Sequence, residues 1–260
     1  MSDKPDGPAY HLHMAAPTIH LSFDQDWAPA WTSLVLRDAL AAAGVQATLF
    51  VTHPCSSLEH LREDGWELGW HPNYLPGSSH GSSLEEVLDT MASWVPEARG
   101  VRAHCLIRGT PYLQAYRERN LIYDASDLRD AETDLKPFVS WTGLVRLPIF
   151  FEDDVHLERN LPVRLSALRL SEPGLKVFTF HPVLVALNAA DLDSYRALKA
   201  DLAKRDIPLT HASHEDFAAH RQDACPGMAD LLSELLAAHM GGSIRIGSPL
   251  HEVAKQALLS

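Results

Sequence analysis

The chain has 260 residues, of which 46% are hydrophobic and 22% are charged, as in a soluble protein with one large domain or a domain with an appendage. Its formal net charge of −12 argues against nucleic acid or an anionic membrane surface as a partner. The three cysteines form no CxxC spacing, which favours a reducing compartment. Because no apolar run could cross a bilayer and the first residues lack the apolar core of an export signal, we expect a cytoplasmic protein without membrane insertion.

Short apolar runs alternate with helical patterns along most of the chain. Residues 1–16 resemble a flexible arm, and a barrel domain is expected over 17–222. The expected strands are 19–23, 45–51, 66–70, 100–103, 121–124, 145–150, 175–180 and 207–210. The expected helices are 29–43, 57–64, 83–95, 110–119, 191–205 and 213–220. This alternation predicts an α/β fold in which seven or eight parallel strands, joined by crossover helices, close or nearly close into a barrel.

Residues 223–260 predict a helical extension after the barrel. The stretch 228–240 has amphipathic spacing and is followed by Gly241 and Gly242, which end a helix. The stretch 248–259 starts with Ser and Pro, which is typical of a helix N-terminus. The two helices would either cover the outside of the barrel or form a homodimer contact.

Polar side chains gather at the expected strand ends, where a parallel barrel builds its site. They are Asp24, Asp26, His71, Asn73, His80, Arg102, His104, Asp124, Glu152, Asp153, Asp154 and His181. Asp24 and Asp26 would repel each other unless a cation lies between them. Carboxylates mixed with imidazoles are ligands for a divalent metal. Taken singly, Asp26 could instead cap the helix that follows, and any one histidine could be an ordinary core or loop residue.

The order of these motifs resembles the NodB-homology polysaccharide deacetylases, carbohydrate esterase family four, and most closely the WbmS-like subgroup found in O-antigen clusters. The matching segments are SFDQDW at 22–27, ATLFVT at 47–52, ELGWHPN at 67–73, the SSHG segment that ends at Gly81, GVRAH at 100–104 and FTFHP at 178–182. The resemblance covers the chain from about residue 17 to about residue 220. It implies a distorted (β/α)7–8 barrel of the polysaccharide deacetylase type.

The resemblance also implies a metal site. In the family's first motif one aspartate is the catalytic base and the next binds metal, so Asp24 would be the base and Asp26 a ligand, with Gln25 inserted between them. His71 matches the first metal-binding histidine of the second motif. The family's second histidine would fall on Leu75, which cannot bind metal. His80 is therefore expected as the third ligand.

Further roles carry over to residues nearby. His104 competes with His80 as the third ligand and is otherwise expected to contact substrate. Arg102 matches the arginine that orients the catalytic aspartate, with Arg108 as an alternative, and His181 matches the general acid. The acidic partner of His181 stays open among Asp124, Asp153 and Asp154. Asn73, Glu152 and Asp153 are expected to contact the sugar.

These roles imply a metal-dependent hydrolase that removes an N-acetyl group from an amino sugar and releases acetate. One divalent ion, expected to be zinc, would be its cofactor. Because no export signal is evident, the expected substrate is a small amino sugar or a nucleotide- or lipid-linked sugar. One alternative is hydrolysis of another C–N bond, by a deformylase or cyclic amidase. The other is a sugar-binding protein without catalytic activity, which the altered second motif keeps open.

Overall fold

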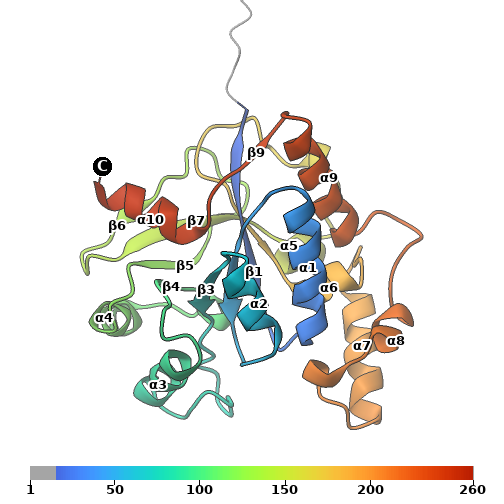
Figure 1. Cartoon of the computed structure of the whole chain (residues 1–260), viewed down its shortest axis with the longest axis horizontal. Helices are drawn as coiled ribbons and strands as arrows, with labels where there is room; N and C mark the ends of the chain where they lie inside the picture. The colour runs from blue at the N-terminus through green and yellow to red at the C-terminus, as the bar shows by residue number, and fades with distance from the viewer. Residues whose placement is uncertain (1–15, 260) are drawn as a thin grey trace, which may run out of the picture.

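Seven parallel strands form a closed barrel in the computed structural model, which describes residues 16–259 (Figure 1). Going round the barrel, the strands are β1 (Thr18–Asp24), β2 (Thr48–Val51), β3 (Glu67–Trp70), β4 (Gly100–Val101), β5 (Tyr123–Leu128), β7 (Val145–Glu152) and β8 (Val177–Phe180). The ring closes because β1 pairs with β2 on one side and with β8 on the other. The predicted (β/α) barrel is thus confirmed, with seven strands.

Helices connect the barrel strands and follow the last of them. They are α1 (Ala30–Ala42), α2 (Ser57–Glu63), α3 (Leu84–Trp94), α4 (Thr110–Glu118), α5 (Asp153–Glu158), α6 (Pro182–Ala186), α7 (Asp193–Lys204), α8 (His214–Ala218), α9 (Met228–Met240) and α10 (Leu250–Leu259). Short 3-10 turns are η1 (His104–Leu106), η2 (Leu165–Ala167) and η3 (Leu209–His211). The sequence analysis did not predict α5 and α6, which have six and five residues.

Both faces of the barrel strands are buried. In β2, Leu49 and Val51 join the layer between barrel and helices, whereas Phe50 points into the barrel, as the two-residue period of a strand requires. Tyr123 fills the interior beside Phe50. It fits there only because β4 begins with glycine: a Cβ at Gly100 would lie 1.9 Å from Cζ of Tyr123.

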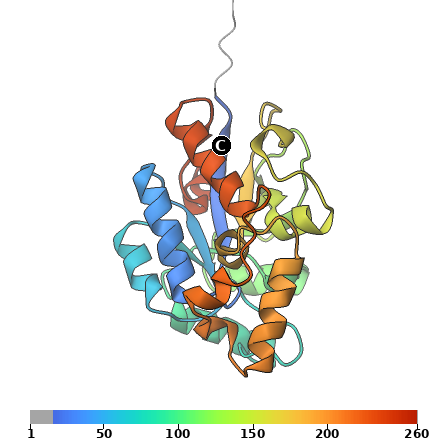
Figure 2. The ribbon, with the colours of Figure 1, turned by 90° about the vertical axis from the view of Figure 1, so that its right-hand side faces the viewer.

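Helix α10 closes the barrel at the N-terminal ends of its strands. Leu250, Val253 and Ala254 pack into the interior cluster. The backbone N–H of Leu250 donates to Oγ1 of Thr48 at 2.9 Å, at the start of β2. Strand β9 (Arg245–Ile246) also pairs with β1 there. Figure 2 shows α9 and α10 near the end at which β1 begins, whereas α7 and α8 lie near the end at which it finishes.

The structure corrects one predicted strand. Residues 207–210 form no strand; they lead into η3 between α7 and α8. The reason is that β8 already pairs with β1, so the ring has no place for another strand. Two short strands were not expected: β6 (Phe138–Val139), which pairs antiparallel with β7, and β9.

The division of the chain stays a prediction. Apart from its last residue, the expected arm at 1–16 lies outside the described residues. The boundary between 222 and 223 and a homodimer contact through the last helices also stay predictions. Over residues 16–259, the helices are all too short or too polar to cross a membrane.

Candidate metal centre and active site

The C-terminal ends of the barrel strands carry the predicted polar residues. Asp24 is the last residue of β1, and Glu152 is the last residue of β7. His71, Arg102 and His181 directly follow β3, β4 and β8. Because all seven strands are parallel, these side chains meet at one mouth, opposite the end that α10 closes.

Asp24 and Arg102 form a buried ion pair. Nη1 of Arg102 donates to Oδ1 of Asp24 at 2.8 Å, and only 2% of the Asp24 side chain is exposed. The other guanidinium nitrogens donate to Oγ of Ser22 and to the carbonyl oxygen of Ala125, and the group stacks over the ring of Phe50 at 4.4 Å. All three nitrogens of the guanidinium therefore donate a hydrogen bond, which holds Arg102, and with it Asp24, in place.

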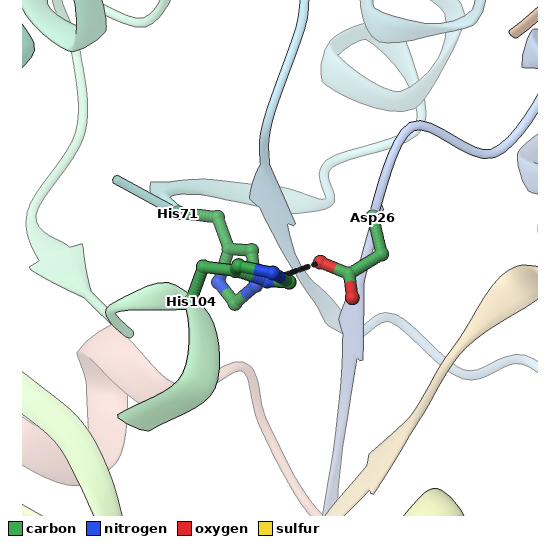
Figure 3. Close-up of side chains that lie close together, drawn as sticks. All are labelled: Asp26, His71 and His104. Atoms are coloured by element: carbon green, nitrogen blue, oxygen red, sulfur yellow. Dashed lines mark hydrogen bonds and ion pairs between the residues drawn. The ribbon is translucent and has the colours of Figure 1, made fainter. Parts of the chain in front are cut away.

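Asp26, His71 and His104 form a compact cluster beside this pair (Figure 3). Oδ1 of Asp26 lies 3.0 Å from Nε2 of His71 and 3.0 Å from Nδ1 of His104. One ligand atom from each residue lies within 4.8 Å of the others. Burial opposes ionisation of Asp26, yet hydrogen bonds from His104 and His71 hold the pKa of its carboxyl well below the usual range.

The donor set fits a divalent ion. Nδ1 of His71 lies 2.7 Å from the carbonyl oxygen of Arg102 and donates to it, which leaves Nε2 facing Asp26. In a neutral imidazole this Nε2 carries a lone pair, which would face the lone pairs of a carboxylate oxygen unless a proton or a cation lies between them. A carbonyl that fixes the far nitrogen is also the usual support of a metal-binding histidine.

His104 reaches Asp26 from η1. Its backbone N–H donates to the carbonyl oxygen of Pro72 at 3.0 Å, which pins the turn against the loop that follows His71. Cys105 and Leu106 adopt left-handed φ values of 55° and 52°, so the chain turns sharply just after His104. Spacing in the sequence could not show this turn, although the short distance from β4 was a signal that His104 lies near the mouth.

His80 lies outside this cluster. Its Nδ1 accepts the backbone N–H of Asn73 at 3.0 Å, and its Nε2 donates to the carbonyl oxygen of Thr52 at 2.8 Å. Both ring nitrogens are thus occupied by backbone groups. Asn73 is also buried, and its Oδ1 accepts the N–H of Leu75 at 3.0 Å, within the same loop.

His181 and Asp153 form a second buried pair. Nδ1 of His181 donates to Oδ1 of Asp153 at 2.6 Å, and the backbone N–H of His181 donates to Oδ2 at 2.7 Å. Although burial lowers the pKa of His181, the charge and hydrogen bond of Asp153 raise it well above its usual value. Nε2 of His181 faces the cluster, 3.5 Å from Oδ2 of Asp26.

The other acidic candidates have different neighbours. Asp124 lies 2.8 Å from Nε of Arg146, on the neighbouring strand, and accepts the hydroxyl of Ser126. Oδ1 of Asp154 accepts the N–H of Val155 in the first turn of α5. Arg108, the alternative to Arg102, pairs with Asp127 at the surface.

Glu152 is buried at the mouth, and its Oε2 has no hydrogen-bond partner among the described residues. Burial, together with the charges of Asp154 and Asp24, raises the pKa of its carboxyl to about 8. A carboxyl in this state can donate a hydrogen bond at neutral pH.

A closed barrel whose strand ends carry these aspartate, histidine and arginine residues has the architecture of the polysaccharide deacetylases. The family model described as WbmS-like polysaccharide deacetylase matches residues 21–199. The chain therefore belongs to the WbmS-like polysaccharide deacetylase family, which confirms the resemblance seen in the sequence.

The chain is also similar to solved structures. A crystal structure from Bordetella bronchiseptica, of a protein described as a polysaccharide deacetylase involved in O-antigen biosynthesis, is 31% identical, with a TM-score of 0.73, over 84% of this chain and 89% of that chain. The Bc1960 peptidoglycan N-acetylglucosamine deacetylase is 13% identical, with a TM-score of 0.49, over 92% and 88%. A polysaccharide deacetylase from Mycobacterium smegmatis is 15% identical, with a TM-score of 0.49, over 98% and 94%. A search of curated proteins gave no match.

Proposed function

We propose that the protein is a metal-dependent hydrolase that removes the N-acetyl group of an amino sugar. The observation that carries this proposal is the Asp26–His71–His104 cluster, which lies between a buried carboxylate and a buried imidazole. Oδ2 of Asp24 is 3.9 Å from Nε2 of His71, and Nε2 of His181 is 3.5 Å from Oδ2 of Asp26. A reacting amide in the mouth would thus have a proton acceptor and a proton donor within reach.

Asp26, His71 and His104 would hold the ion, and we propose zinc because two imidazoles and one carboxylate are a common zinc ligand set. Such an ion supplies Lewis acidity toward the amide carbonyl and the attacking water. This assignment favours His104 over His80 as the third ligand, since both ring nitrogens of His80 already bond to backbone groups.

Asp24 would accept the proton of the attacking water. Arg102 holds its Oδ1 at 2.8 Å, so Oδ2 is the oxygen that remains for the proton. His181 would donate from Nε2 to the amine that leaves, because an amine leaves readily only after protonation. Asp153 would act through His181, by fixing its ring and stabilising its charged form.

Glu152 and Asn73 would contact the sugar. The support for Glu152 is its unpaired Oε2 at the mouth, which could bond to a hydroxyl of the substrate. The B. bronchiseptica relative is described as acting in O-antigen biosynthesis. This description supports an amino-sugar intermediate, free or linked to a nucleotide or lipid, as the substrate. A cytoplasmic location stays a prediction.

Metal removal and product analysis test the proposal together. The purified protein would be stripped with a chelator, reloaded with zinc, and incubated with N-acetylated amino sugars and their nucleotide-linked forms. We expect acetate release only after reloading. Formate release from N-formyl sugars in place of acetate would favour the deformylase alternative. Sugar binding without release of either acid would favour a binding protein.

A further inference from the structure

Gln25, the residue between Asp24 and Asp26, is completely buried and bonds to the segment that follows β2. Its Oε1 accepts the backbone N–H groups of Thr52 at 2.9 Å and His53 at 3.1 Å. Its Nε2 lies 3.1 Å from Sγ of Cys55 and donates to it. One side-chain amide thus ties the end of β1 to the loop after β2.

This anchor directly precedes a strained turn. Asp26 and Trp27 adopt left-handed φ values of 42° and 56°, which cost residues with a Cβ about 1–2 kcal/mol each. The turn is also held on its far side, because the N–H of Trp27 donates to Oγ1 of Thr52 at 3.0 Å. Strained backbone of this kind persists only where its surroundings hold it in place.

The same loop reaches the segment that carries His71. The carbonyl oxygen of Thr52 accepts Nε2–H of His80, whose Nδ1 accepts the N–H of Asn73, two residues after His71. A continuous path of hydrogen bonds therefore runs from Gln25 through Thr52 and His80 to this loop. Two of the three residues in the metal cluster lie in segments that the path connects.

We propose that Gln25 is a positioning residue for the metal centre: its amide holds the turn that presents the Asp26 carboxylate to His71 and His104. The inference rests on the metal site proposed above. Without the amide, the turn can relax to ordinary φ values, and Oδ1 of Asp26 leaves its place 3.0 Å from both imidazoles. Metal affinity should then fall, although no ligand has been removed.

The test compares zinc affinity among variants, by competition with a chromophoric chelator. Gln25→Met keeps the length of the side chain but loses its hydrogen bonds, and we expect zinc to bind about 10–100-fold more weakly, the usual effect of losing a support behind a ligand. Gln25→Glu keeps an oxygen for the N–H groups of Thr52 and His53, and should recover most of the affinity. Thr52→Val, which removes the bond from Trp27, should also weaken zinc binding. It replaces Gln25→Met in the test if Gln25→Met does not fold.

Asn188→Leu is the matched control, because Asn188 is a buried amide whose hydrogen bonds within the described residues reach none of the proposed site residues. Its Oδ1 accepts the N–H groups of Ala229 at 3.0 Å and Asp230 at 3.2 Å, at the start of α9. It should lower the melting temperature of the metal-free protein as Gln25→Met does, but leave zinc affinity unchanged. The positioning role is overturned if Gln25→Met binds zinc as tightly as the unchanged protein, or weakens binding no more than Asn188→Leu.

Failure of the metal site itself gives a different result. If the unchanged protein binds zinc no better than Asp26→Ala, the proposed site is wrong and the role of Gln25 falls with it. If the unchanged protein binds zinc and Asp26→Ala does not, but Gln25→Met and Thr52→Val bind normally, only the role of Gln25 is wrong.

Discussion

Asp153 holds His181 by two bonds at once, one to the ring at 2.6 Å and one to the backbone N–H at 2.7 Å. The carboxylate therefore sets both the place and the charge of the imidazole. Asp153→Asn keeps the shape but removes the charge that raises the pKa of His181. Since His181 must be protonated to act as the acid, activity is lost where pH passes its pKa. We expect the alkaline limb of the kcat profile to move to lower pH by about one unit or more.

The pH profile of Asp153→Asn is measured beside that of Asp154→Asn, whose carboxylate bonds to the N–H of Val155. The second variant should shift the limb much less. Equal shifts would mean that His181 senses the general negative charge of the mouth instead of a specific partner.

Asp24→Asn tests whether Asp24 is the catalytic base. The amide cannot accept the proton of water, so kcat should fall about 10²–10⁴-fold. The zinc content of the purified variant should stay near that of the unchanged protein, because the proposed ligands are intact. Asp26→Asn is the counterpart, and it should lose metal as well as activity. Full activity in Asp24→Asn would show that the base lies elsewhere.

His104→Ala and His80→Ala separate the two candidate ligands. Removing a ligand should lower zinc affinity far more than removing a residue that only braces the loops, for which about 10–100-fold is typical. We therefore expect His104→Ala to lose zinc during dialysis and His80→Ala to retain it at high zinc. The reverse order of affinities would return His80 to the ligand set.

The raised pKa of Glu152 should make the stability of the folded protein depend on pH. Its pKa is raised from 4.5 to about 8, so between these values the folded protein binds a proton that the unfolded chain has released. Stability from this group therefore falls as pH rises from about 4.5 to about 8. Glu152→Gln, always neutral, should melt higher than the unchanged metal-free protein at pH 8.5, by about 2–4 °C for each kcal/mol gained. The difference should vanish near pH 4.

Leu250 tests the closure of the barrel by α10. Its side chain is fully buried among interior residues. Leu250→Ala should destabilise the protein by about 2–5 kcal/mol, as measured by denaturant unfolding. Leu258→Ala, at an exposed position of the same helix, is the control and should change little. If Leu250→Ala also changed stability little, α10 would not belong to the folding unit.

The sequence predicted the barrel because apolar strands alternate with helical patterns along most of the chain, and polar residues end or follow most of these strands. Asp24, Asp26, His71, Arg102 and His181 could be placed at one mouth on that basis alone. His104 could also be placed near the mouth, but its contact with Asp26 could not be predicted, because the sharp turn at Cys105 and Leu106 uses left-handed backbone that no residue type there requires. The resemblance to the family's second motif favoured His80 as the third ligand, whereas in the structure both ring nitrogens of His80 bond to backbone groups.

Short strands were also difficult to predict from the sequence. β9 has two residues, and it exists because β1 offers a free edge near Thr18. The strand expected at 207–210 failed for the opposite reason, since β8 had already taken the neighbouring edge of β1. Strand pairing of this kind depends on contacts between segments far apart in the sequence, which local strand propensity cannot predict.

Contacts of α10 and β9 with the first strands have a consequence for synthesis. Leu250 and Thr48 are 202 positions apart, yet their bond helps to close the barrel. While the ribosome is still making residues 244–259, the N-terminal end of the barrel is not yet covered. The apolar side chains inside it are then exposed to water and to other nascent chains. We expect the protein to complete its fold only after this segment has emerged, and to depend until then on chaperones that shield apolar surface.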